Sequence, residues 1–126
     1  MDDRERHAQG MKVRREVLGD SHVDKSEGSK DSFTAEFQDL ITRYAWGEIW
    51  SRPGLPRRTR SLLTIAVLAA LNRPEELRMH LRGALANGVT HDEIKETLLH
   101  CAIYCGVPAA NSAFQIASET LQSGRS

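Results

Sequence analysis

The sequence predicts an all-α protein, a bundle of about six helices arranged as helical hairpins. Apolar residues recur at the spacing of one helical face in successive segments. Prolines and glycines separate these segments, and apart from "AVL" no stretch alternates as a strand would. The 126 residues suit one domain with a hydrophobic core of its own.

The N-terminal part predicts a helical arm followed by a polar linker. Residues 1–18 contain good helix formers but few apolar side chains, so a helix here needs another surface to pack on. Residues 19–32 are polar and rich in Gly and Ser, which is typical of a loop. We therefore expect the arm and linker over residues 1–31 and the main domain over residues 32–126.

The first helix of the main domain is expected to begin near Ser32 and to end before "SRPGLP" at residues 51–56. One helical face carries Phe33, Phe37, Leu40, Ile41 and Tyr44. Five of the seven aromatic residues lie in this segment. Most of these aromatic side chains should therefore belong to the core.

Four more helices are expected, over about 57–72, 74–87, 90–105 and 108–121. The first of these is apolar nearly all round, which is typical of a central buried helix. Asn72 and Gly106 are helix stop signals, and Thr90 with Glu93 forms a capping-box pattern. Leu99 and Ile103 make a second apolar strip on their helix. The excess of hydrophobic surface predicts a homo-oligomer.

Charge and composition exclude several classes of partner. Seventeen basic residues balance seventeen acidic ones, which removes the electrostatic argument for binding nucleic acid or an anionic membrane. The longest apolar run, residues 62–71, is too short to span a bilayer. The charged N-terminus has no signal-peptide pattern, and two cysteines without an export signal indicate the cytoplasm.

Cys101 and Cys105 are four residues apart on one face of their expected helix. They do not form a C-x-x-C motif, and a rigid helix orients such a pair badly for a disulfide. His100 is the histidine beside them, and it points to another side of the helix. We expect ordinary buried thiols, which behave as small hydrophobic groups.

Two residues could carry acid–base chemistry. His80 lies at the margin of an apolar helical face, where it is either a core-edge histidine or an acid/base near neutral pH. If its helix continues through Gly47, Glu48 shares the stripe of Phe37 and Tyr44. Its carboxylate would then be paired or have a raised pKa. If the helix frays at Gly47, Glu48 faces water instead.

Four arginines, Arg52, Arg57, Arg58 and Arg60, lie within nine residues with no acidic residue among them. The arginine side chain can grip a carboxylate in two places. Arg57 and Arg58 are near a helix N-terminus, where the dipole disfavours positive charge. Arg60 lies on the apolar side of its helix, where a buried arginine needs an anion. An anionic ligand would relieve both problems, and a solvated basic turn is the alternative.

Trp46 and Trp50 lie off the main apolar stripe and could wall a pocket or an interface. The sequence contains no Gly-rich phosphate loop, nucleophile elbow or metal-binding motif. These residues together support a small all-α oligomer with a carboxylate-binding pocket and an acid/base pair.

Three segments, "YAWGEIW", "GLPRRTRS" and "YCGVPAAN", are similar to the carboxymuconolactone decarboxylase family. The resemblance covers about residues 32–121. It implies an alkylhydroperoxidase D-like fold, a trimer-based homo-oligomer of six subunits and no cofactor or metal. The implied substrate is a dicarboxylate lactone. The implied reaction is decarboxylation of 4-carboxymuconolactone to β-ketoadipate enol-lactone in protocatechuate catabolism.

Peroxidase relatives in the same superfamily carry C-x-x-C-x-x-x-H. Their histidine matches His80, but their cysteines fall on Arg73 and Glu76, so that dithiol chemistry is excluded here. This departure favours the decarboxylase interpretation. Two alternatives stay open, a thiol-dependent hydroperoxidase and a non-catalytic dicarboxylate-binding protein.

The resemblance also suggests roles for individual residues. Arg60 is expected to hold a substrate carboxylate, helped by Arg57 and Arg58. His80 is expected to donate a proton or to stabilise the oxyanion, and Glu48 to orient or reprotonate His80. The aromatic side chains expected to wall the site are Trp46, Trp50 and Tyr104.

Overall fold

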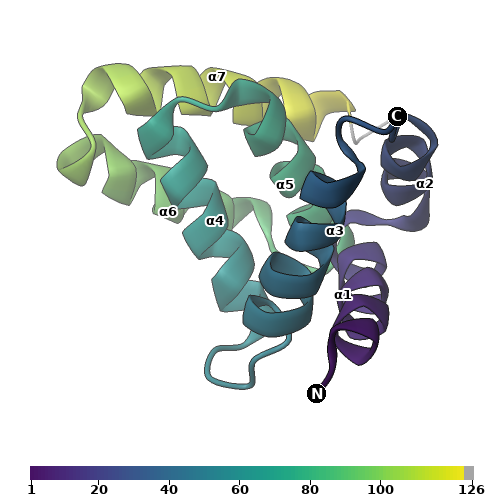
Figure 1. The fold of residues 1–126 in the computed structure, drawn as a ribbon. Helices are drawn as coiled ribbons and strands as arrows, with labels where there is room; N and C mark the ends of the chain where they lie inside the picture. The colour runs from purple at the N-terminus through teal and green to yellow at the C-terminus, as the bar shows by residue number, and fades with distance from the viewer. Residues whose placement is uncertain (124–126) are drawn as a thin grey trace. The chain divides into compact units, whose positions relative to one another are not determined.

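A computed structural model describes residues 1–123, and all regular structure in this range is helical (Figure 1). The elements are α1 (Asp3–Leu18), α2 (Asp20–Gly28), α3 (Ala35–Ile41), the π-helix η1 (Thr42–Ile49), α4 (Arg57–Leu71), α5 (Pro74–Ala86), α6 (His91–Tyr104) and α7 (Val107–Ser123). The all-α prediction is confirmed. The helices group into two compact units, Met1–Pro56 and a second that begins at Arg57. Within the described residues, no helix is long and apolar enough to cross a membrane.

The helix α2 lies where a polar loop was expected, so that prediction was wrong for Asp20–Gly28. Val23, the apolar residue of this segment, is fully buried. Arg15 on α1 forms ion pairs with Asp20 and Asp24, at 3.0 and 2.9 Å. A short polar helix is marginal by itself, and these tertiary contacts with α1 account for its formation.

The backbones of α1 and η1 approach each other closely because glycines occupy their contact points. A Cβ atom on Gly10 would lie 1.9 Å from the carbonyl oxygen of Thr42. A Cβ atom on Gly47 would lie 2.4 Å from the carbonyl oxygen of Arg6. Beside this crossing, Val13 and Val17 pack with Trp46 in the core of the first unit. The N-terminal helix therefore packs on η1.

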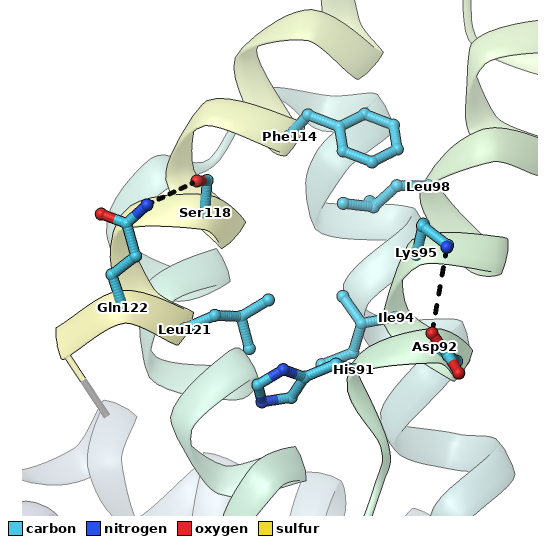
Figure 2. A pocket seen from close by; sticks show the side chains of 9 residues that line it. All are labelled: His91, Asp92, Ile94, Lys95, Leu98, Phe114, Ser118, Leu121 and Gln122. Atoms are coloured by element: carbon cyan, nitrogen blue, oxygen red, sulfur yellow. Dashed lines mark hydrogen bonds and ion pairs between the residues drawn. The ribbon is translucent and has the colours of Figure 1, made fainter. Parts of the chain in front are cut away.

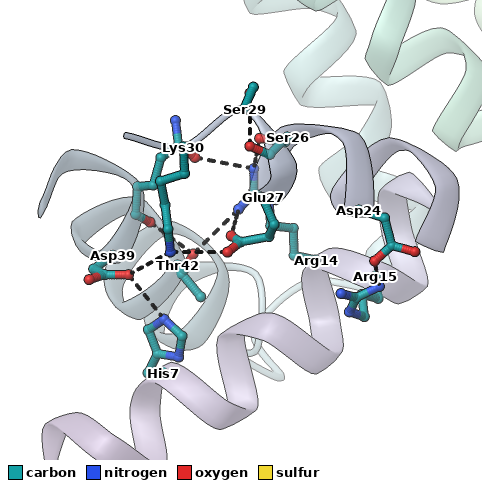
Figure 3. A network of polar contacts seen from close by, with 11 residues as sticks. His7, Arg14, Arg15, Asp24, Ser26, Glu27, Ser29, Lys30, Asp39 and Thr42 are labelled. Atoms are coloured by element: carbon teal, nitrogen blue, oxygen red, sulfur yellow. Dashed lines mark hydrogen bonds and ion pairs between the residues drawn. The ribbon is translucent and has the colours of Figure 1, made fainter. Parts of the chain in front are cut away.

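A buried arginine joins the helices of the first unit (Figure 3). Arg14 on α1 is 5% exposed, and its guanidinium donates to Ser26 Oγ at 3.0 Å and to Gln38 Oε1 at 3.3 Å. The same group lies 3.5 Å from Glu27 Oε1. Burial lowers the pKa of Arg14, and the Glu27 carboxylate opposes this shift. One side chain thus ties α1 to both α2 and α3, with its charge close to acceptors.

The helix that starts at α3 continues through Gly47, but from Thr42 to Ile49 it is a π-helix. The Thr42 hydroxyl donates to the Gln38 carbonyl at 2.8 Å, the kind of bond that bends a helix. Because each π-helical turn takes up one more residue, α-helical spacing no longer assigns the face of Glu48. π-Helical turns are rare and occur often at functional sites.

The aromatic face of α3 and η1 points away from the core of the first unit. Phe33 is 93% exposed, Phe37 60% and Tyr44 42%. The expectation that most aromatic residues of this segment belong to the core was therefore wrong. The buried residues of η1 are Thr42, Trp46 and Gly47, which face α1 instead.

The second unit has one core built by α4, α5, α6 and α7. Ile65 of α4, Leu81 of α5 and Leu98 of α6 are almost completely buried in it. α4 contacts all three other helices, which agrees with its expected central place. One side of α4 is nevertheless open, since Leu63, Val67 and Leu71 are each more than half exposed. The expectation that this helix is buried on all sides was therefore wrong for the single chain.

We expect Gly10→Ala to destabilise the first unit. Alanine would improve helix propensity by about 1 kcal/mol. Overpacking against a backbone oxygen that cannot swing away costs about 1–3 kcal/mol or more, so the net effect is destabilising. Urea unfolding followed by tryptophan fluorescence measures this unit, because Trp46 and Trp50 both belong to it.

Gly28→Ala is the matched control. Gly28 ends α2, and a Cβ atom added there would have no other atom within 4 Å. Its unfolding midpoint should equal or exceed that of the wild type, because alanine improves helix propensity and meets no clash. A Gly10→Ala protein as stable as the wild type would contradict the close crossing of α1 and η1.

Candidate active site

The arginine cluster lies at the start of the second unit. Arg57 begins α4, whose first turn carries no acidic side chain. Arg57 and Arg60 are half-buried, whereas Arg58 is exposed. Arg58 grips Glu93 of α6 in two places, with Nε 2.7 Å from Oε2 and Nη2 2.5 Å from Oε1. The protein therefore supplies an anion for Arg58 itself.

Glu93 caps the start of α6 and also binds Arg58 of α4. Its Oε1 accepts the backbone N–H of Thr90 at 2.9 Å, and the Thr90 hydroxyl accepts the N–H of Glu93 at 3.1 Å. The expected capping box is thus confirmed at the start of α6. The Arg58 guanidinium, followed by the Thr90 N–H, lowers the pKa of Glu93 from 4.5 to about 2. The cap was visible in the sequence, but its pairing with Arg58 was not.

We expect Glu93→Gln to flatten the acid dependence of stability. Glutamine keeps the capping geometry and removes the charge. Because the folded pKa of Glu93 is lowered, its contribution is full above about pH 4.5 and is lost as pH falls toward 2. The melting temperature of the wild type should therefore fall more steeply over this range than that of the variant.

Glu96→Gln, at an exposed position on the same helix, is the control and should retain the steep acid dependence of the wild type. Circular dichroism melts at several pH values between 7 and 3 make the comparison. Equal slopes for wild type and Glu93→Gln would show that the Arg58 pair does not contribute in solution.

His80 lies on α5 at the edge of the core, as its position in the sequence predicts. Its neighbours on this helix, Leu77, Leu81 and Ala84, are buried, while His80 itself is half-buried. An imidazole in this position is held by packing and still reachable from outside.

Glu48 lies on η1 and pairs with α1. Its Oε2 is 3.5 Å from Nε of Arg6, and its side chain is 46% exposed. Of the alternatives left open by the sequence, the structure favours a paired carboxylate. Arg6 was missed because no local pattern links it to Glu48. Only the packing of α1 on η1 brings the two together.

The expected aromatic residues belong to different units, Trp46 and Trp50 to the first and Tyr104 to the second. Trp46 and Trp50 stack with their ring centroids 5.0 Å apart, and Trp46 is 5% exposed in the core of the first unit. Tyr104, at the end of α6, is 78% exposed and stacks on His100 at 4.8 Å. Tyr104 is thus available to a ligand, whereas Trp46 mainly shapes the unit that carries Glu48.

A pocket of about 290 Å³ lies between α6 and α7 (Figure 2). Apolar side chains of Ile94, Leu98, Phe114 and Leu121 line it, and His91, Asp92, Lys95, Ser118 and Gln122 complete the lining. None of the expected site residues is among them. This pocket is therefore not the cavity that those residues were expected to form. In the described range, no three His, Cys, Asp or Glu side chains cluster as a metal site would need.

The structure is that of a small all-helical protein with arginine and histidine side chains at the margins of its second unit and a paired glutamate in its first. The chain belongs to the Carboxymuconolactone decarboxylase family, whose sequence model matches residues 35–119. The resemblance seen in the sequence is thereby confirmed.

Curated relatives agree with this assignment. The chain is 57% identical to 4-carboxymuconolactone decarboxylase of Acinetobacter baylyi over 122 residues, which cover 97% of this chain and 91% of that protein. It is 44% identical to nitrosuccinic acid decarboxylase of Metarhizium robertsii over 113 residues, covering 90% of this chain and 79% of the relative. A 4-carboxymuconolactone decarboxylase sequence of Pseudomonas putida is 50% identical over 48 residues, which cover 38% of this chain and all of that sequence.

Proposed function

We propose that the protein decarboxylates 4-carboxymuconolactone to β-ketoadipate enol-lactone in the catabolism of protocatechuate. The observation that carries this proposal is the 57% identity, over 97% of the chain, to a decarboxylase of this name. The second relative is a decarboxylase of a different acid, which supports a carboxy-lyase in general.

The chemistry of the substrate explains how such a reaction proceeds without a cofactor. The leaving carboxylate is attached to a carbon next to a C=C bond that is conjugated with the lactone carbonyl. Electrons of the breaking C–C bond flow through this path to the carbonyl oxygen, giving a dienolate that is then protonated on carbon. Nitrosuccinic acid likewise carries its own electron-withdrawing group, the nitro group. In both cases the protein has to bind carboxylates, stabilise a developing negative charge and supply a proton.

Arg60 and Arg57 are the proposed carboxylate ligands. Both are half-buried on α4, and no acidic residue lies in the first turn of that helix. Arg58 was expected to share this role, but it would first have to release Glu93. We therefore assign it a lesser part in substrate binding than Arg57 and Arg60.

His80 is the proposed proton donor or oxyanion partner, and Glu48 the residue that orients or reprotonates it. His80 suits this role because it is half-buried at the margin of a packed helix. Glu48 already pairs with one cation, since its Oε2 lies 3.5 Å from Nε of Arg6. Trp46, Trp50 and Tyr104 are proposed to wall the site and to exclude water from the leaving carboxylate.

We expect His80→Ala to lose at least about a hundredfold in kcat, the typical contribution of a general acid or base. Loss of the ultraviolet absorbance of freshly generated 4-carboxymuconolactone, followed directly, measures the rate. His91→Ala, which removes an exposed histidine of α6, is the control and should keep wild-type turnover. Near-full activity of His80→Ala would remove His80 from the mechanism.

The link between Glu48 and His80 is tested by adding Glu48→Gln and the double variant to the same assay. If Glu48 acts through His80, the double variant should be little worse than His80→Ala alone. Losses that simply multiply would assign Glu48 an independent role.

We also propose a cytoplasmic homo-oligomer, built from trimers into a hexamer. Both cysteines are free thiols, which suits a reducing compartment. Leu63, Val67 and Leu71 form an exposed apolar stripe on α4, and Leu99 with Ile103 forms a second strip on α6. Such surface is usually covered by another subunit.

Val67→Asp, in the middle of the α4 stripe, should lower the molar mass measured by light scattering after size-exclusion chromatography. A buried, unpaired carboxylate strongly opposes association. Gln115→Asp, at a position on α7 outside both apolar strips, should leave the mass unchanged. A wild-type protein that is monomeric at micromolar concentration would contradict the proposed assembly.

A further inference from the structure

The two cysteines lie at the C-terminal end of α6 and differ in their surroundings. Cys101 is 4% exposed within the core of the second unit, whereas Cys105 is exposed. Cys105 is the C-cap residue, and its N–H donates to the Cys101 carbonyl at 2.7 Å. The pair therefore joins a protected thiol to one that a small solute can reach.

The two thiols are neighbours. Burial raises the pKa of the Cys101 thiol, and the adjacent Cys105 thiol raises it further, partly through a hydrogen bond. By helical spacing, Cys101 and Cys105 lie on the same face of this helix as Leu98, and Cys105 lies at the end where that face opens to solvent. Leu99 and Ile103 point to another side of the helix.

A rigid helix would hold such a pair too far apart for a disulfide, but here the second cysteine lies at the helix end. Cβ atoms four residues apart in a helix are about 5–6 Å from each other, and a disulfide needs about 3.5–4.5 Å. α6 ends at Tyr104, and Gly106 turns the chain away with φ +99°. Cys105 can therefore move toward Cys101 by loosening its single capping bond.

We infer that Cys101 and Cys105 are a modification site that hydroperoxides oxidise to an intramolecular disulfide. The exposed Cys105 thiolate attacks the outer oxygen of the hydroperoxide, the O–O bond breaks, and Cys105 sulfenic acid and an alcohol, or water, are formed. Cys101 sulfur then attacks the Cys105 sulfur, and water leaves with the Cys101 proton. Overall, two thiols and one hydroperoxide give one disulfide, one alcohol and one water.

The disulfide would also regulate the decarboxylase, a consequence that rests on the proposed function. Tyr104 lies between the two cysteines in the chain and is a proposed wall of the site. Closing the disulfide draws in the turn that holds Tyr104 and changes its position. Oxidation should therefore lower turnover, and reduction should restore it.

Intact-mass measurement of the full-length protein tests the modification itself. After treatment with a small excess of hydrogen peroxide, the wild type should lose the mass of two hydrogen atoms and both free thiols. Dithiothreitol should reverse both changes. Cys105→Ser and Cys101→Ala should each fail to show this loss, and because Cys105 is exposed, its variant should fold normally. A wild type that gains only oxygen atoms, or does not react, would overturn the inference.

The lactone assay, run on the same samples, tests the regulation separately. Turnover of the wild type should fall several-fold on oxidation and recover with dithiothreitol, while Cys105→Ser should be insensitive. A disulfide that forms without changing turnover would overturn the regulatory role and leave the modification site. A reduced wild type without turnover would overturn the proposed function, and the mass measurement would still decide on the disulfide.

Discussion

The close contact between the backbones of α1 and η1 sets the geometry of the first unit. It exists because Gly10 and Gly47 have no side chain where Thr42 and Arg6 present their carbonyl oxygens. Once the helices are this near, Trp46 covers the valines of α1, and Arg6 comes within ion-pair distance of Glu48. The environment of a proposed catalytic carboxylate thus depends on an N-terminal helix that lies before the family match at residues 35–119.

The second unit depends in a similar way on one carboxylate. Glu93 closes the N-terminus of α6 and binds Arg58, so the starts of α4 and α6 are joined through a single side chain. The Arg58–Glu93 ion pair also distinguishes Arg58 from the neighbouring arginines. Arg58 is exposed and serves the fold, whereas Arg57 and Arg60 are half-buried and are the proposed ligands of a substrate carboxylate. Of an arginine cluster that looks uniform in the sequence, Arg58 is thus paired within the fold, while Arg57 and Arg60 stay the proposed ligands.

Sequence-based predictions were correct wherever the interactions that fix a feature lie within one short segment. Asn72 has the positive φ of a helix stop, Gly106 turns the chain after α6, and Thr90 with Glu93 closes its capping box. Prediction failed where the cause is distant. The polar α2 needed ion pairs from α1, and the stripe of Phe33 and Phe37 is exposed although its spacing indicated a core face. For the same reason the margin position of His80 could be predicted, but the partner of Glu48 could not.

The helical class, most helix boundaries, the family and the residue types available for acid–base and carboxylate chemistry can all be derived from the sequence alone. They follow from periodicity, caps and motifs, all of which act over a few residues. The three-dimensional packing was needed to establish how Arg58 and Glu48 are paired and which aromatic side chains are buried. It also showed that Cys105 is exposed at a helix end beside a buried Cys101. The physical reason is that pairing and burial depend on atoms brought together from distant parts of the chain.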